Sequence, residues 1–279
     1  MRIQYASDLH IDEWPITTNF CTFLTPNAPF LVLAGDICSA WAPQYTTFLA
    51  WCSRLWHSVF IVTGNHEYHN SEGKTLADTD NHIHNTCLKF KNIIFLQAGA
   101  SYKVPGTDIR IVGATFWSNI DAKMWNRAAE KKSDYKKIYI NTGGVTRPIT
   151  PGEITAIHRW HSDALRAALV PTYPEEKLVV ITHHMPSKTL LEPEYRGEEW
   201  HSFYASDADY LFNPFIKLWI CGHSHRATTL KAPRGPLLVM NARGYNRDHE
   251  LARTVDIYNP RITTLLPSLV NARQRCFKK

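Results

Sequence analysis

Short runs of apolar and β-branched residues recur along this chain, and turn residues bound each of them. The runs are RIQYAS, FLVLAG, VFIVTG, IIFLQAG, IRIVGA, LVVITHH, LWICGH and LLVMNARG. Runs of this length and composition predict buried strands. Between them, the segments 42–58 and 151–169 have helical spacing. Because strands alternate with helices, the sequence predicts an α/β fold.

The segment 151–169 has the features of an amphipathic helix. Pro151 and Glu153 suit its first turn. We expect His158 and His161 on the surface of this helix rather than in a metal site. One apolar face is expected from Ile154, Ile157, Trp160, Ala164, Leu165 and Ala168.

Residues from about 117 to 150 break the alternation of strands and helices. This stretch is polar, contains aromatic residues and is interrupted at Gly143 and Gly144. We interpret it as an insertion or cap within a single domain of residues 1–279. A cover over an active site and a plain surface excursion are both open at this stage.

Composition limits the class of protein. With 279 residues, 44% hydrophobic and 20% charged, the chain can bury one large core. No run approaches the ~18 apolar residues of a membrane span, and the start MRIQYASDLH lacks the pattern of a signal peptide. We therefore expect a cytoplasmic protein without a membrane segment. Six cysteines without any CxxC pair predict reduced thiols and no cysteine zinc site.

The net charge of +6 is mild and comes largely from two clusters, 123–137 and 273–279. This charge suits an anionic substrate. No nucleic-acid recognition motif accompanies the clusters, so a nucleic-acid partner is not favoured. The sequence leaves the oligomeric state open.

Five of the apolar runs end in side chains that can bind a metal ion. In an α/β sheet the carboxyl ends of the strands share one edge, so these side chains should converge. Carboxylate and amide oxygens with imidazoles, and without thiolates, suit Mn, Fe or Zn, and a set this large suits two ions that share a carboxylate. The residues are Asp8, His10, Asp36, Asn65, His66, Glu67, His183, His184, His223 and His225.

The spacing within this set carries further information. Asp8 and His10 are two residues apart, as are His223 and His225, so on a regular strand each pair would point to one face. Three glycines directly precede ligands and would let the backbone turn sharply and approach the metals closely. These are Gly35, Gly64 and Gly222.

The five strand ends follow the order D-x-H, G-D, G-N-H-E, a strand-end H and G-H-x-H, from Asp8 to His225. This joint pattern resembles the calcineurin-like metallophosphoesterase superfamily. The resemblance implies a four-layer α/β/β/α sandwich with two mixed sheets packed face to face. It also implies a dinuclear metal site at the carboxyl ends of the strands.

Carried over residue by residue, the resemblance assigns a ligand set to each metal. The first set is Asp8, His10, Asp36 and His225. The second set is Asp36, Asn65, His183 and His223, with Asp36 bridging the two ions. His184 is the alternative to His183. His183 is preferred because the family's strand-end histidine directly follows the apolar run and precedes a turn, which here ends at Pro186.

The resemblance also implies a reaction, the hydrolysis of a phosphoester by a metal-bound hydroxide. Asp36 and His66 are the expected catalytic residues, and Asn65 and His66 the expected phosphate contacts. His66 would act as an electrostatic stabiliser or general acid for the leaving group. Glu67 is expected to orient its neighbours rather than to touch the substrate.

Two further residues have open roles. Arg243, in NARGY (241–245) after the run LLVM, would clamp a phosphate in bidentate fashion or face outward from a turn held by Gly244. Trp41 would stack on a base or sugar, or pack in the core or at the rim. Packing is the favoured role for Trp41.

The substrate class is narrowed by what the motifs lack. GDICSAW has no arginine-bearing element like the one that protein serine/threonine phosphatases of the superfamily carry after Gly-Asp. Glu67 departs from the GNHD of the nuclease branch and of several phosphodiesterases. We expect a small phosphodiester or nucleotide as substrate. A phosphomonoesterase, a nonspecific nuclease and a non-catalytic metal-binding regulatory protein of the same fold are the alternatives.

Overall fold

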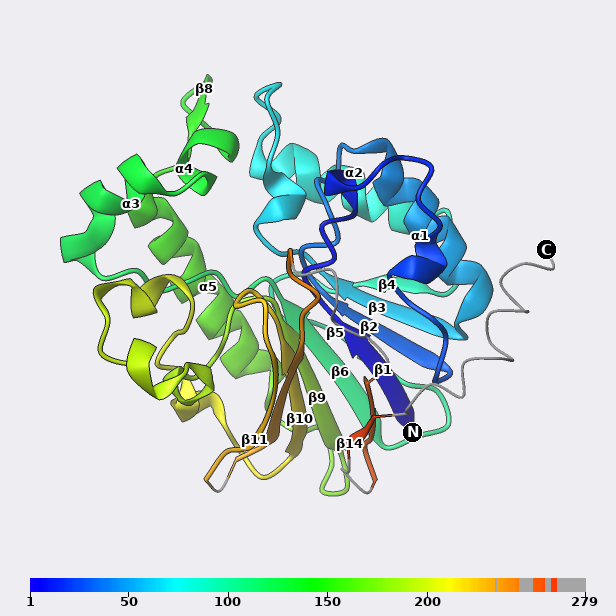
Figure 1. The fold of residues 1–279 in the computed structure, drawn as a ribbon. Helices are drawn as coiled ribbons and strands as arrows, with labels where there is room; N and C mark the ends of the chain where they lie inside the picture. Colours follow the sequence, from blue (N-terminus) through cyan, green and yellow to red (C-terminus); the bar gives the residue numbers. More distant parts are fainter. Residues whose placement is uncertain (234, 246–252, 259–261, 265–279) are drawn as a thin grey trace.

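The computed structural model describes residues 1–233, 235–245, 253–258 and 262–264, and two six-stranded mixed sheets dominate it (Figure 1). In the first sheet β1 to β4 are parallel, and β13 and β14 extend one edge in antiparallel fashion, in the order β14-β13-β1-β2-β3-β4. The strands are β1 (Arg2–Ala6), β2 (Phe30–Ala34), β3 (Ser58–Val62), β4 (Ile93–Phe95), β13 (Arg253–Asp256) and β14 (Ile262–Thr264).

The second sheet repeats this plan with four parallel strands at its centre. Its order is β11-β12-β10-β9-β6-β5, and both edge strands, β5 and β11, are antiparallel to their neighbours. The strands are β5 (Ala100–Lys103), β6 (Ile109–Ala114), β9 (Lys177–Thr182), β10 (Ile216–Cys221), β11 (Ala227–Lys231) and β12 (Leu237–Asn241). Each of the apolar runs that predict a strand therefore contains a strand.

The core between the sheets follows from the alternation of side chains along each strand. In β2, Val32 and Ala34 face the second sheet, whereas Leu31 and Leu33 face the helices outside. The carboxyl ends of the two sheets meet at one end of the molecule. There Ser7, just after β1, pairs with Ala242, just after β12.

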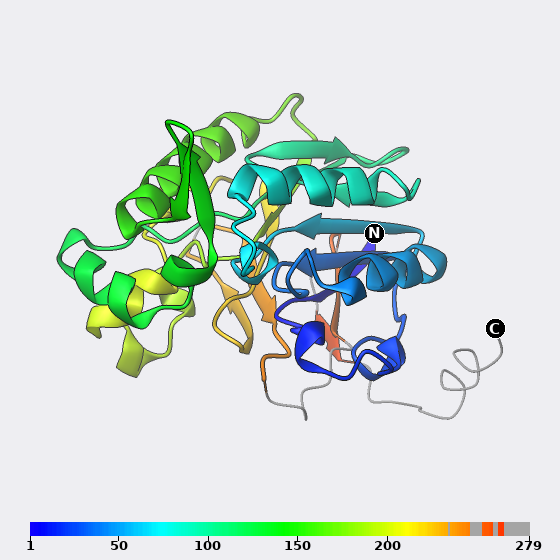
Figure 2. The same ribbon diagram turned by 90° about the horizontal axis from the view of Figure 1, so that it is seen from above.

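Helices cover the outer face of each sheet and complete the predicted four-layer sandwich, which is confirmed. Figure 2 shows α1 (Pro43–Leu55) in blue and α2 (Leu76–Cys87) in cyan along the first sheet. On the second sheet lie α5 (Pro151–Ala168) and a segment of short 3-10 helices. The latter are η5 (Lys188–Leu190), η6 (Pro193–Tyr195), η7 (Glu199–Phe203) and η8 (Asp209–Leu211). Of the helices described, none is long and apolar enough to cross a membrane.

The orientation of α5 differs from the expectation. A capping box between Thr150 and Glu153 starts this helix. His158 and His161 are only 5% and 2% exposed, whereas Trp160 is 58% exposed. The reason is the loop after β6: the His158 ring contacts the Trp117 carbonyl, and Phe116 N donates to His161 Nδ1 at 3.1 Å. The packed face of the helix therefore includes both histidines, and the surface prediction is wrong.

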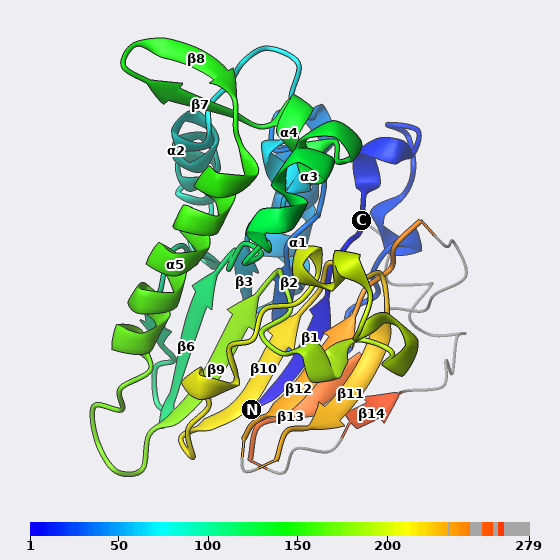
Figure 3. The same cartoon turned by 90° about the vertical axis from the view of Figure 1, so that its left-hand side faces the viewer.

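The irregular stretch 117–150 forms a small layer of its own. It contains η4 (Ala122–Met124), α3 (Trp125–Lys131), α4 (Asp134–Lys137) and the hairpin β7 (Tyr139–Thr142) and β8 (Val145–Pro148). Figure 3 shows α3, α4 and the hairpin beyond the carboxyl ends of the strands. A cluster of buried side chains joins this layer to Tyr68 and Phe203. The segment thus lies on the side of the molecule where the predicted ligands gather.

The cysteines agree only in part with the expectation of reduced thiols. Cys38, Cys52, Cys87 and Cys221 are free and buried. Cys21 is disulfide-bonded, so the expectation is wrong for this residue. Cys276 and the rest of the basic cluster 273–279 lie outside the described residues.

Candidate active site

The predicted ligands lie on the turns directly after the strands, not on the strands themselves. β1 ends at Ala6 and β10 at Cys221. We expected a regular strand to direct Asp8 and His10 to one face, and another strand to direct His223 and His225. That expectation is wrong. Left-handed backbone, which L residues rarely adopt and which clusters at functional sites, aims them instead. The residues with positive φ here include Asp8 (54°), His10 (45°), Asp36 (54°), His223 (72°) and His225 (54°).

The glycines beside the ligands have no room for a side chain. A Cβ on Gly64 would lie 2.1 Å from Asp36 Oδ1, and one on Gly222 would lie 2.6 Å from Asp8 Oδ2. A Cβ on Gly35 would lie 2.5 Å from Gly64 N. The backbone at these glycines therefore lies close to the candidate ligands, and its approach to the metals stays a prediction.

His183 directs its Nε2 at two oxygens. Its Nδ1 lies 2.8 Å from the Ala34 carbonyl, which can only accept, so Nδ1 carries a proton, and in the neutral imidazole Nε2 has the lone pair. Nε2 lies 3.2 Å from Asn65 Oδ1 and 3.4 Å from Asp36 Oδ2. Three acceptor atoms thus face one another.

His223 adds a fourth acceptor to this group. Its Nε2 lies 3.1 Å from the Phe203 carbonyl, so the proton sits there and Nδ1 has the lone pair. Nδ1 lies 3.2 Å from His183 Nε2. With both imidazoles neutral, these four lone pairs repel one another, and either a proton on His183 Nε2 or a cation can relieve the repulsion. A cation in their midst removes that repulsion, because ligands about 2.0–2.2 Å from one metal stand roughly 3–3.5 Å apart.

A second group of ligands lies on the other side of Asp36. His10 Nε2 is 3.1 Å from His225 Nε2, and His225 Nε2 is 3.5 Å from Asp8 Oδ1. Asp36 Oδ2 is 4.0 Å from His10 Nε2. Asp8, His10 and His225 can surround one ion, and Asp36, His183 and His223 another. The donor atoms fit two cations with Asp36 between them.

The pKa values of the buried residues at the site couple metal binding to proton binding. Asp8 and Asp36 are almost completely buried. Burial raises the pKa of Asp8, while for Asp36 the charges of His183 and His66 outweigh burial and hold the pKa well below its usual range. Burial opposes charge on His183 too, but the two carboxylates raise the pKa of His183 to about 10. A cation bound here would therefore compete with a proton.

His66 lies at the rim of the site. Its backbone N–H donates to Asp36 Oδ1 at 2.8 Å. Its ring centroid lies 4.4 Å from that of His10 and 4.3 Å from that of His69. The His66 side chain is only partly buried, unlike Asp36 and His10, so it can face both the cluster and an incoming molecule.

Glu67 is buried behind the site and holds three backbone amides. Its Oε2 accepts from Asp36 N at 2.9 Å and from Gly64 N at 2.6 Å, and its Oε1 accepts from Ile37 N at 2.7 Å. These bonds join the turns that carry Asp36 and Asn65. The geometry agrees with an orienting role.

The structure separates the two adjacent histidines after β9. His184 Nδ1 lies 3.4 Å from the Thr115 carbonyl, and its ring packs 5.4 Å from Trp117 and 4.1 Å from His223. Among the described residues, His184 belongs to none of the groups that can surround a metal, whereas His183 does. This placement favours His183 as the ligand.

Arg243 does not face the ligand cluster. Its side chain is buried, Nη1 donates to the Thr22 carbonyl at 2.9 Å, and the guanidinium lies 4.8 Å from the rings of Trp14 and Phe23. This placement argues against both a phosphate clamp and an outward-facing arginine. Tyr245 is at the site instead, stacked on the His10 ring at 4.7 Å.

Trp41 packs against protein rather than lining the metal cluster. Its ring stacks on His82 at 4.4 Å, and Nε1 donates to Thr79 Oγ1 at 3.1 Å. The favoured packing role agrees with these contacts.

Sequence reasoning missed two residues at the site. Tyr245 stands in the NARGY motif, which drew attention to Arg243 alone. Asp134 accepts from Asn65 Nδ2 at 3.0 Å and lies 2.6 Å from His69 Nε2. Asp134 belongs to the stretch 117–150, where no motif marks it, so only the fold could place it here.

Comparisons with known proteins agree with this geometry. The family model of the calcineurin-like phosphoesterases matches residues 1–227. An uncharacterised protein, L509, from Acanthamoeba polyphaga mimivirus is 28% identical over 270 residues, which cover 89% of this chain and 93% of that protein. The crystal structure of phosphopantetheinyl hydrolase from Mycobacterium tuberculosis superposes with a TM-score of 0.62 at 18% identity, covering 88% of this chain and 90% of that one. The chain belongs to the calcineurin-like phosphoesterase family and is a phosphoric ester hydrolase.

Proposed function

We propose that this protein is a dinuclear metal-dependent phosphodiesterase that acts on a small phosphodiester or a nucleotide. The observation that carries the proposal is the arrangement around Asp36, where imidazole nitrogens and carboxylate oxygens converge in two groups, each close enough to surround one ion. The family model supports the reaction type. The similarity to phosphopantetheinyl hydrolase, at 18% identity, supports the fold and does not define the substrate.

The ligand sets of the proposal follow the two groups in the structure. One ion would be held by Asp8, His10, Asp36 and His225. The other would be held by Asp36, Asn65, His183 and His223. Oxygen and imidazole donors without thiolate suit Mn, Fe or Zn. When bound, two such ions lower the pKa of water and neutralise the oxygens of a phosphate.

Residues at the rim of the site would bind the phosphate, donate a proton and limit the access of water. His66 would hold a phosphate oxygen and donate a proton to the leaving oxygen, since its ring is partly exposed beside His10. Asn65 directs Nδ2 at Asp134, so we assign it to the metal through Oδ1. Tyr245 is 56% exposed and stacks on His10, where it would limit the approach of water from one side.

The segment 117–150 would act as a cap that is tied to the site. Besides the Asn65–Asp134 bond, Lys132 Nζ donates to Tyr204 Oη at 3.2 Å, which joins the cap to the segment over the second sheet. Deleting the cap should therefore change the preference among substrates. Unchanged preference in a folded deletion variant would argue against this role.

The test compares bis(p-nitrophenyl) phosphate with p-nitrophenyl phosphate in the presence of Mn²⁺. We expect faster hydrolysis of the diester, and loss of hydrolysis in Asp36→Asn, because the variant lacks the shared carboxylate. Asp163→Asn is the matched control, since Asp163 is 71% exposed on α5. A protein that binds two ions and cleaves neither ester would overturn the proposal, and faster monoester hydrolysis would overturn the diester assignment.

A further inference from the structure

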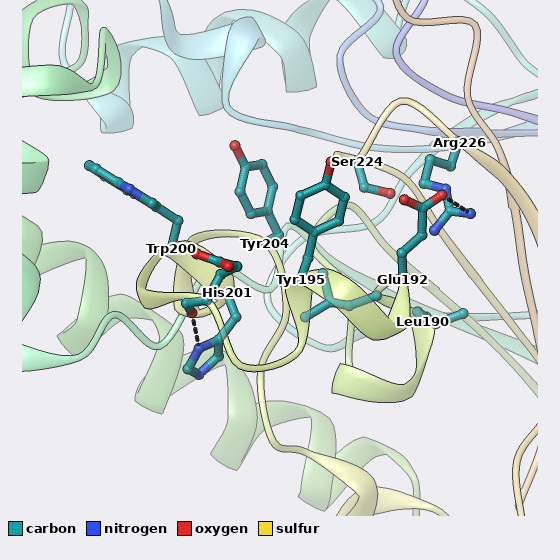
Figure 4. Close-up of a pocket in the computed structure, with 10 residues that line it drawn as sticks. Leu190, Glu192, Tyr195, Trp200, His201, Tyr204, Ser224 and Arg226 are labelled. Carbon is teal, nitrogen blue, oxygen red and sulfur yellow. Dashed lines mark hydrogen bonds and ion pairs between the residues drawn. The ribbon is translucent and has the colours of Figure 1, made fainter.

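A pocket of about 350 Å³ lies beside the ligand cluster (Figure 4). One wall is the segment 190–204, and the other is the loop after β10 with Ser224 and Arg226. Its volume is in the range of small-molecule sites. None of the residues that line it is used in the proposed metal chemistry.

The pocket shares its boundary with the ligand cluster. Ser224, which lines the pocket, stands between His223 and His225 in the chain. The ring of Tyr204, on the opposite wall, lies 5.5 Å from the ring of His223, and the preceding carbonyl of Phe203 accepts from that histidine. A phosphoester whose phosphate lies at the cluster can therefore place one ester group in the pocket.

The walls of the pocket are aromatic and apolar. Leu190 and Leu191 are buried, and three aromatic side chains, Tyr195, Trp200 and Tyr204, also line the pocket (Figure 4). Tyr195 is 55% exposed, so part of its side chain is open to a ligand. Stacking of a flat ring on such a side chain contributes about 1–3 kcal/mol.

The cap stabilises two of these rings. Lys132, at the end of α3, lies 5.2 Å from the ring of Trp200 and 4.9 Å from that of Tyr204. It also donates to the Tyr204 hydroxyl. The aromatic wall is thus held in place from outside the pocket, so it does not need a ligand to form.

The charges on the walls disfavour an anionic guest. Arg226 is paired with Glu192, with Nη2 2.5 Å from Oε1. Glu198 adds a second carboxylate to the lining. Arg226, the one arginine or lysine among the lining residues, is therefore already neutralised, and a second negative group on the substrate would meet the carboxylate of Glu198.

We propose that this pocket binds an uncharged aromatic ring on the ester group of the substrate, a ring of about the size of a nucleobase. The assignment rests on the proposed phosphoesterase function, because the metal cluster must hold the phosphate. It adds a substrate preference to that function: aromatic ester groups over aliphatic ones, and uncharged ester groups over anionic ones. Tyr195 is the most exposed of the three aromatic side chains, and we assign it the main role in this preference.

The test measures binding to the Mn²⁺-loaded protein by calorimetry, using phosphonates, which have no ester bond to hydrolyse. Benzylphosphonate should bind about tenfold tighter than cyclohexylmethylphosphonate of similar size, which corresponds to ~1.4 kcal/mol. 4-Carboxybenzylphosphonate should bind more weakly than benzylphosphonate. Methylphosphonate, which has no ring, reports on the metal cluster alone.

Variants of Tyr195 locate the preference in the pocket. Tyr195→Ala should remove most of the preference for benzyl over cyclohexylmethyl, and Tyr195→Phe should retain it. Tyr210→Ala is the matched control, because Tyr210 is 58% exposed and does not line the pocket. Methylphosphonate should bind all four proteins equally. Equal binding of the two ring compounds to the wild type, or a preference that survives in Tyr195→Ala, would overturn the pocket assignment.

Hydrolysis separates the failure of this assignment from the failure of the proposed function. Benzyl methyl phosphate and cyclohexylmethyl methyl phosphate have alcohols of similar acidity as leaving groups, and their hydrolysis can be followed by ³¹P NMR. A benzyl preference in binding without hydrolysis of either diester would keep the pocket and overturn the phosphodiesterase. Hydrolysis of both at equal kcat/KM, with equal binding of the phosphonates, would keep the enzyme and overturn the pocket.

Discussion

Asn65 donates from Nδ2 to Oδ1 of Asp134 at 3.0 Å, and this bond fixes which end of the amide faces the ligand cluster. An asparagine amide offers an oxygen and an NH₂ group that can exchange places by rotation. Only the oxygen can bind a cation. With Nδ2 held by a carboxylate of the cap, Oδ1 stays 3.2 Å from His183 Nε2.

Asp134→Ala should therefore weaken metal binding without removing a ligand. Loss of an outer hydrogen-bond partner of a ligand typically costs about 10–100-fold in metal affinity. The measurement is Mn²⁺ titration of the metal-free protein. Glu130→Ala is the control, since Glu130 is 68% exposed in the same cap. Equal Mn²⁺ affinity in wild type and Asp134→Ala would show that the amide needs no such partner.

His66→Ala should keep both metal ions and lose most of the rate. His66 can join His10 and Asp36 around an ion, but two groups that can surround an ion are present without it, and its ring is partly exposed. A general acid contributes about 10²–10⁴-fold to a rate. Metal content and kcat measured on the same samples test this, with His57→Ala on the exposed turn before β3 as control. Loss of metal together with activity would make His66 a ligand instead.

Glu67→Gln should destabilise the fold around the site. The carboxylate accepts three backbone N–H bonds, and an amide would direct its own NH₂ group at one or more of these donors. An unsatisfied buried donor costs about 1–3 kcal/mol. Urea unfolding of the metal-free protein measures the loss, and Glu72→Gln, at a side chain 70% exposed, should leave stability unchanged. Unaltered stability of Glu67→Gln would contradict the role of these bonds.

The ligand positions could be predicted because each belongs to a short local motif at the end of a buried strand. The rule that parallel strands end at one edge predicts that Asp8, Asp36 and His223 converge, and the structure brings them together. Their backbone could not be predicted in the same way, because left-handed φ values at non-glycine residues are set by the surrounding structure.

Other features depend on contacts that the sequence does not record. Asp134 meets Asn65 across 69 positions of chain, and the contact exists because the cap packs on Tyr68 and Phe203. His161 lies on a helix whose predicted end differs from the observed one by one residue, yet its burial follows from the loop after β6, where Phe116 N donates to its ring nitrogen. Periodicity gives the helix, while its partners decide which polar side chains it buries.

The neighbours His183 and His184 should respond differently to substitution. His183→Ala removes one of four converging acceptors, so the purified protein should lose one metal equivalent. His184→Ala removes a ring that packs on Trp117 and should keep both equivalents. Elemental analysis of both variants, with near-ultraviolet circular dichroism to verify folding, gives the comparison. The reverse pattern would make His184 the ligand.

The buried His161 should make the stability of the protein fall below neutral pH. Phe116 N donates to its Nδ1, and burial, with a smaller effect of His158, lowers the pKa of His161 to about 3. In the unfolded chain a histidine has a pKa of about 6.5. Between these values only the unfolded state takes up the proton, so the free energy of unfolding decreases as pH falls from 6.5 towards 3.

His161→Gln isolates this contribution, because glutamine retains an acceptor and does not titrate. At pH 7.5 the histidine is neutral in both states, so the difference between wild type and variant reports only packing and hydrogen bonding. At pH 5.0 the wild type should lose ~2 kcal/mol more than the variant, from about 1.4 kcal/mol per pH unit below 6.5. Urea unfolding of the metal-free proteins at the two pH values measures both quantities. If wild type and His161→Gln lose the same stability on acidification, His161 is charged in the native state and the neutral, buried histidine described above is wrong.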